Sequence, residues 1–191
     1  MQIPRSIYVA NFTLTASIGV VFGLIASLQD ELGFADGVLG LIAASAFFSA
    51  VVAQLLLAPL ADRGHTKVLM AGAIVIAALG SLWFAVASSA WELILARVLT
   101  GLGIGAFAPA ARAVVANADT SRAGERLGRL TAVETSGFVA GPVVGAFINE
   151  IWGLKAPFLT FACALILILP SLLKLNFSPP PIAENKISRT E

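Results

Sequence analysis

The chain has 191 residues, of which 58% are hydrophobic and 12% are charged, and its net charge is +1. Soluble domains carry about 25% charged residues, so this composition excludes an ordinary soluble domain and indicates a protein that crosses a membrane several times. The balanced charge argues against a nucleic-acid partner. The single cysteine excludes an internal disulfide, and the single histidine argues against a metal site, so we expect no cofactor.

Six apolar segments are each long enough to cross a bilayer, whose core of about 30 Å takes about 20 helical residues. They are residues 6–28, 37–60, 67–88, 91–116, 128–149 and 153–173. The first is longer than the apolar part of a signal peptide and is followed by further spans, so we interpret it as a retained helix. We therefore predict a six-helix bundle over 1–176, followed by a cytoplasmic tail or the start of a linker over 177–191.

The positive residues predict the orientation of these helices, because cytoplasmic loops of membrane proteins are enriched in Lys and Arg. One side of the predicted bundle carries most of them: Arg5, Arg63, Lys67, Arg112, Arg122, Arg126, Arg129, Lys174, Lys186 and Arg189. The other side has Lys155, and Arg97 lies within a helix. We therefore expect a multi-pass protein of the cell membrane (the inner or plasma membrane), with both termini in the cytoplasm.

Asn11 and Thr15 are polar residues one turn apart in the first predicted helix, so they share a face. They could line a cavity within the bundle. The alternative is that these groups bond to their own backbone or to a neighbouring helix, as single polar groups in membrane helices commonly do.

A short charged loop joins the second and third predicted helices and makes them antiparallel neighbours. The loop resembles the signature sequence of the major facilitator superfamily, Gly-x-Leu-Ala-Asp-Arg-x-Gly-Arg-Lys. The matching positions are Leu60, Ala61, Asp62, Arg63 and Lys67. The chain departs from the signature at Ala58, which replaces the first glycine, and at His65 and Thr66, which stand at the Gly-Arg positions.

The fourth predicted helix carries a charge followed by a glycine pattern. Arg97 precedes Gly101, Gly103 and Gly105, and this run is similar to the helix-4 pattern of the same superfamily. Arg97, Gly101 and Gly105 recur every four residues and share a face. A charge inside a membrane helix usually faces a cavity or a partner, although an arginine can also extend to the headgroups. The resemblance implies a cavity-facing cation that influences proton or substrate binding.

The fifth predicted helix carries four glycines and a proline: Gly128, Gly137, Gly141, Pro142 and Gly145. This spacing resembles the helix-5 motif of drug/proton antiporters, with Ala146 where another glycine often follows. Gly137, Gly141 and Gly145 line one face, which lets a neighbouring helix approach closely. Pro142 removes a backbone hydrogen bond and bends the helix. The set could provide static packing alone, but the resemblance implies that it seals the cavity against leak during exchange.

Glu134 lies within the fifth predicted helix, where a carboxylate could carry protons. By depth, Arg97 is about 15 Å away, too far for a salt bridge, whereas Arg112 lies near the same depth. Asp62 is on the same side, so we predict a cytoplasmic cluster of Asp62, Arg112 and Glu134. We assign a gating role to this cluster together with two loop residues, Arg63 and Lys67. The alternative is a permanent structural ion pair.

Together the three motifs resemble the N-terminal six-helix half of a transporter family that usually has twelve helices. The resemblance implies an all-α membrane protein arranged as a three-plus-three inverted repeat. Because the sequence places no paired carboxylates, metal-ligand cluster or Ser/His pair at membrane depth, we expect that the protein is not an enzyme. The resemblance also implies alternating access, with export of small, apolar or drug-like molecules in exchange for protons. The expected partners are the lipid bilayer, the substrate, protons, and a second six-helix half or a second copy.

The half-length match leaves three alternatives for the molecule as a whole. The chain is a truncated product, or its second half is a separate polypeptide, or two copies associate. A different class of function is a membrane interaction or assembly protein that uses the same bundle without transport.

Overall fold

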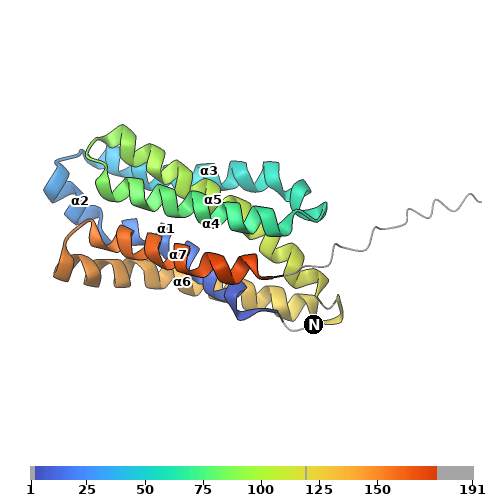
Figure 1. Ribbon diagram of the computed structural model, residues 1–191. Coiled ribbons are helices and arrows are strands. Elements are labelled where there is room, and N and C mark those ends of the chain that lie inside the picture. Colours follow the sequence, from blue (N-terminus) through green and yellow to red (C-terminus); the bar gives the residue numbers. More distant parts are fainter. Residues whose placement is uncertain (1–2, 119, 176–191) are drawn as a thin grey trace, which may run out of the picture.

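The computed structural model describes residues 3–118 and 120–175, and its regular elements are helices (Figure 1). They are α1 (Arg5–Gly23), α2 (Ile25–Leu32), α3 (Asp36–Asp62), α4 (Thr66–Val86), α5 (Ala90–Asn117), a short 3-10 helix η1 (Thr120–Arg122), α6 (Ala123–Trp152) and α7 (Ala156–Leu173). Within this part of the chain, six helices are long and apolar enough to span a membrane. The prediction of an all-α, six-span membrane protein is therefore confirmed. The three-plus-three repeat stays a prediction, and the predicted tail over 177–191 lies outside the described residues.

The six long helices run side by side along one axis, and α2 lies at one end of the bundle (Figure 1). Helices α3, α4 and α5 form one group, and α1, α6 and α7 form a second. Within the groups, α5 packs against both α3 and α4, and α6 packs along α1. Helix α7 contacts α4 as well as α1, so it joins the two groups.

The first predicted helix is interrupted. Helix α1 ends at Gly23 and α2 begins at Ile25, so the break at Leu24 falls inside the predicted range. The amide of Leu24 donates to the carbonyl of Val21 at 3.0 Å, which is a tighter turn than an α-helix makes. Gly23 lies against the backbone of Pro142 in α6, where any side chain would collide.

Glycines bring α5 into backbone contact with both of its neighbours. A Cβ on Gly101 or Gly105 would collide with the carbonyls of Ala46 or Ala50 in α3. Gly103 points the other way, and a Cβ there would lie 2.7 Å from the carbonyl oxygen of Ala73 in α4. The alternating glycines therefore let α5 fit between two helices at once.

In the other group, α1 and α6 also meet in a close contact, which we call the α1–α6 seam. Gly137 and Gly141 lie against the backbone carbonyls of Phe12 and Ala16, and Gly145 packs on Val20. The contact is reciprocal, because Gly19 and Gly23 of α1 lie against Phe138 and Pro142 of α6. Gly128, in contrast, has open space where its side chain would be. Three of the motif glycines thus form the seam and the fourth lies outside it.

The loop after α3 is short because one glycine turns the chain. Gly64 has a φ of +88°, in the left-handed region that favours glycine. The amides of Gly64 and His65 donate to the carbonyls of Ala61 and Leu60, both at 3.1 Å, and α4 begins at the next residue. Helices α3 and α4 therefore run in opposite directions.

Candidate transport cavity

A cavity of about 380 Å³ lies between α1, α3, α5 and α6. Its lining is mostly apolar and contains a few polar groups: Thr15, Ile18, Phe47, Ala50, Val51, Gln54, Ile104, Gly105, Ala108, Arg112, Thr131, Glu134, Thr135 and Phe138. Small-molecule sites are typically concave and apolar with a small number of placed polar groups. The cavity therefore has the composition of a site for a small, largely apolar molecule.

Three phenylalanine rings gather beside this cavity, and two of them, Phe47 and Phe138, belong to its lining. Phe22, Phe47 and Phe138 come from α1, α3 and α6, and their ring centroids lie 5.9, 5.7 and 6.0 Å apart. Phe138 meets both other rings edge to face, a geometry that aromatic pairs favour. The rings lie toward the end of the bundle that holds α2, because Phe22 precedes the end of α1 by one residue.

An ion pair lies toward the opposite end. Nη2 of Arg112 in α5 is 3.3 Å from Oε2 and 3.5 Å from Oε1 of Glu134 in α6. The two side chains remain 40% and 28% exposed. Both residues line the cavity, so the pair joins the two helices while staying in contact with the cavity space.

Asp62 does not join this pair. It is the last residue of α3 and is exposed, and among the described residues the structure gives it no salt bridge with Arg112. The neighbouring Ala61 is buried, and one residue along a helix turns the side chain by about 100°, so Asp62 points outward. The cluster expected from depth alone therefore has two members in this structure.

The other two loop residues also lie outside the cavity. Arg63 is exposed directly after α3. Lys67, in the first turn of α4, lines a shallow hollow with Leu169 and Leu173 of α7. Neither Arg63 nor Lys67 lines the cavity or takes part in the Arg112–Glu134 ion pair.

Arg97 is buried between α5 and α1 with 2% of its surface exposed. Its Nη2 donates to the carbonyl of Ile18 at 3.1 Å, and its Nε has no hydrogen-bond partner among the described residues. Ile18 lines the cavity but Arg97 does not, so the guanidinium lies behind the cavity wall. Arg97 extends into the protein interior rather than to the headgroups.

Asn11 and Thr15 take different places although they share a helix face. The side-chain amide of Asn11 is buried and donates to the carbonyl of Leu130 in α6 at 3.3 Å. Thr15 lines the cavity, and its hydroxyl donates to the carbonyl of Asn11 at 2.9 Å. The first residue therefore joins two helices and the second contributes to the cavity wall.

Several cavity residues were not predicted. Thr131 lies three residues before Glu134 and shares its face of α6, so helical periodicity could have found it, whereas Thr135 directly follows Glu134 and has no such signal. Gln54 is a polar residue in an apolar span, which is a recognisable signal for an inward-facing group. Phe47 and Phe138 resemble ordinary apolar residues of a membrane helix, so no local signal marks them.

The sequence of this chain is similar to known proteins over most of its length. It is 29% identical to the multidrug resistance protein MdtG of Klebsiella pneumoniae, over 78% of this chain and 36% of that protein. It is 28% identical to the quinolone resistance protein NorA of Staphylococcus aureus, over 76% of this chain and 38% of that protein. The chain thus spans less than half the length of these curated relatives.

The fold is similar to solved transporter structures. The inward-open xylose transporter XylE from E. coli matches with a TM-score of 0.75 and 18% identity, covering 92% of this chain and 47% of that one. The family model described as Major Facilitator Superfamily matches residues 7–191. This match confirms the resemblance seen in the motifs and groups the chain with transporters rather than with enzymes. The chain belongs to the Major Facilitator Superfamily.

Proposed function

We propose that this chain forms half of a secondary transporter that exports small, apolar or drug-like molecules in exchange for protons. The observation that carries the proposal is the cavity of about 380 Å³, whose apolar wall includes the Arg112–Glu134 ion pair. The relatives MdtG and NorA, named for multidrug and quinolone resistance, support a drug-like substrate.

Glu134 is the group on which a proton would act. As a carboxylate it binds Arg112 and holds α5 and α6 together at one end of the cavity. A proton on Glu134 removes its negative charge and with it the attraction to Arg112, so the two helices can separate at this end. Release of the proton restores the pair. Because the side chains are partly exposed to the cavity, protons and substrate can both reach them.

Alternating access needs a second bundle, on this or another chain, or a second copy. The helices α3 and α6 flank the cavity and carry large exposed apolar side chains, among them Phe48, Leu55, Val143 and Phe147. We propose that this face meets the second bundle. The exposed side chains of Asp62 and Arg63, with Lys67 beside them, would then gate by contacting that bundle, and Arg97 would support the cavity wall.

The test is transport in vesicles with an imposed pH gradient. The chain is reconstituted alone and together with a second six-helix half, and export of a fluorescent lipophilic dye is followed. We expect dye movement that depends on the gradient and that is abolished by Glu134→Gln. The matched control is Glu150→Gln, which removes the same charge from an exposed position on α6 outside the cavity.

A folded, monodisperse protein that moves no dye in either preparation would contradict the proposal. That result would favour the alternative function, a membrane interaction or assembly protein. Equal transport by the wild type and Glu134→Gln would instead show that Glu134 carries no proton.

A further inference from the structure

A second hollow, of about 540 Å³, lies where the start of α1 meets the start of α6. We call it the arginine pocket. Arg122 lines it from the end of η1, Arg126 and Arg129 line it from the first two turns of α6, and Tyr8 lines it from α1. It is separate from the transport cavity, with which it shares no lining residue.

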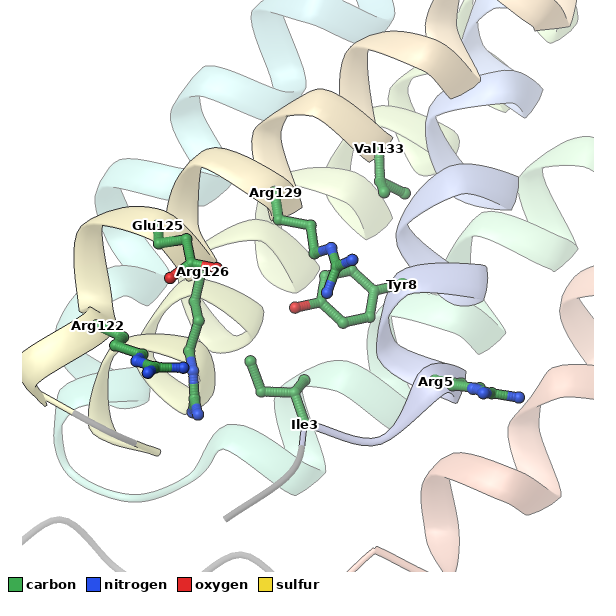
Figure 2. A pocket seen from close by; sticks show the side chains of 8 residues that line it. All are labelled: Ile3, Arg5, Tyr8, Arg122, Glu125, Arg126, Arg129 and Val133. Atoms are coloured by element: carbon green, nitrogen blue, oxygen red, sulfur yellow. The ribbon is translucent and has the colours of Figure 1, made fainter.

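The pocket is strongly positive. Arg5 is a fourth arginine in its lining, and Glu125 is the single carboxylate. Arg122 and Arg126 come from the η1–α6 side of the pocket, whereas Arg5 comes from the α1 side and extends away from them (Figure 2). Like charges one turn apart repel one another, so an anion bound among Arg122, Arg126 and Arg129 would relieve that repulsion.

The length of α6 places this pocket at the membrane surface. Its 30 residues extend over about 45 Å, about 15 Å more than the bilayer core. The charged residues Glu125, Arg126 and Arg129 fall in its first seven positions, so the extra length lies at this end. Arg122 and Arg126 therefore lie at headgroup depth, and Val133, two turns further, lies where the apolar span begins.

The wall of the pocket also contains apolar residues, one near the arginines and one deeper along α6 (Figure 2). Ile3 and Val133 are its apolar lining residues, and Tyr8 presents both a ring and a hydroxyl (Figure 2). Tyrosine is enriched at membrane–water interfaces because it has this mixed character. The arginines thus suit a phosphate, and the apolar residues suit the beginning of an acyl chain.

We propose that the arginine pocket binds a phosphate group, and that an anionic membrane phospholipid supplies it. Guanidinium groups form paired, charge-assisted hydrogen bonds with phosphate oxygens. Basic pockets between membrane helices recognise anionic headgroups by the same chemistry. A lipid bound here connects Tyr8 of α1 with Arg129 of α6, at the end of the seam that forms one wall of the transport cavity. The site is independent of whether the chain transports.

Native mass spectrometry of the purified, delipidated chain tests this proposal. The probes are dioleoylphosphatidylglycerol, dioleoylphosphatidylcholine and, as the soluble source of the same chemistry, inorganic phosphate. The test variant is Arg122→Gln with Arg129→Gln. The matched control is Lys155→Gln with Lys174→Gln, which removes two positive charges from exposed positions outside the pocket.

We expect phosphatidylglycerol to bind more tightly than phosphatidylcholine. Its affinity should fall roughly ten- to thirtyfold in the test variant and stay unchanged in the control, because each arginine near the surface contributes strongly to anion binding. Variant-sensitive binding of inorganic phosphate, without preference for phosphatidylglycerol, would support the phosphate site and identify a soluble anion as its source.

Equal effects of the test and control variants, or equal affinity for the two lipids together with no phosphate binding, would overturn the proposal. Arg129→Lys keeps the charge and provides a second test if the double variant does not fold. It should lose part of the affinity, because lysine lacks the paired donors of arginine. In the wild type, affinity for phosphatidylglycerol should also fall as salt is raised, and binding insensitive to salt would contradict an electrostatic site.

Discussion

At the scale of single residues, Arg97 is enclosed by the protein, whereas the side chains of the Arg112–Glu134 pair are partly exposed. An ion pair with exposed members contributes up to about 1 kcal/mol to stability. The 40% and 28% exposure of Arg112 and Glu134 places their pair in that range, so it can break and re-form in the transport cycle that we propose. Arg97 is enclosed and makes one side-chain hydrogen bond among the described residues, to Ile18. It is therefore a fixed support behind the cavity wall.

Arg97→Met should separate the structural contribution of this residue from its functional one. Methionine fills a similar volume and removes a buried charge, and such replacements are often neutral or stabilising, whereas Arg97→Ala leaves a cavity that costs about 2–5 kcal/mol. Thermal unfolding in detergent should therefore show Arg97→Met near the wild type and Arg97→Ala well below it. If both variants unfold equally early, the guanidinium itself stabilises the fold through its bond to Ile18.

At the scale of the helices, the glycines of α5 and α6 decide which elements touch. Each of these helices relies on missing side chains to approach its neighbours closely. The glycine motif of α6 contains three glycines that pack against α1, and a fourth, Gly128, that has open space beside it. This difference provides a matched experiment within one element.

Gly141→Ala should destabilise the protein, because its Cβ would collide with the backbone carbonyl of Ala16, which cannot move aside as a side chain can. Overpacking of this kind costs about 1–3 kcal/mol. Gly128→Ala is the control: nothing lies near its Cβ, and alanine favours a helix over glycine by up to about 1 kcal/mol. Unfolding temperatures should therefore move in opposite directions. A stable Gly141→Ala protein would show that the seam can open without loss of fold.

At the scale of the whole molecule, the exposed apolar faces differ in what they should meet. Val143 on α6 is 70% exposed and Leu167 on α7 is 77% exposed. Val143 lies on the face that we assign to the second bundle, whereas Leu167 lies on a helix that does not line the cavity. Exposure alone does not distinguish a contact with lipid from a contact with protein.

Single-cysteine labelling can distinguish the two contacts. In a Cys163→Ala background, a fluorophore on Val143→Cys should be shielded from quencher-bearing lipids in the transporting assembly, while one on Leu167→Cys should be quenched. With the chain alone as a monomer, both should be quenched. Strong quenching at both positions in the transporting assembly would show that α6 faces lipid and that another face meets the second bundle.

The sequence predicted the features that depend on local composition and on the depth of a residue in the membrane. Six apolar runs indicated six spans, and counting residues from the helix ends placed Arg112 beside Glu134. It did not predict the break at Leu24, because the contact between Gly23 and Pro142 joins residues far apart in the chain. Asp62 was misplaced relative to Arg112 because depth carries no information on which way a side chain points. The phenylalanine cluster was not predicted because its members come from three helices.

The α1–α6 seam also affects how this protein can change by mutation. Backbone atoms meet at Gly137 and Gly141, so almost any larger residue there disturbs the fold. Thr131 and Thr135, on the same helix, present side chains to open space in the cavity. Substitutions at these threonines can therefore alter which molecules fit while helix packing stays intact. One helix thus combines positions that accept only glycine with positions that can accept other side chains, and under the proposed function substrate preference can change without loss of the bundle.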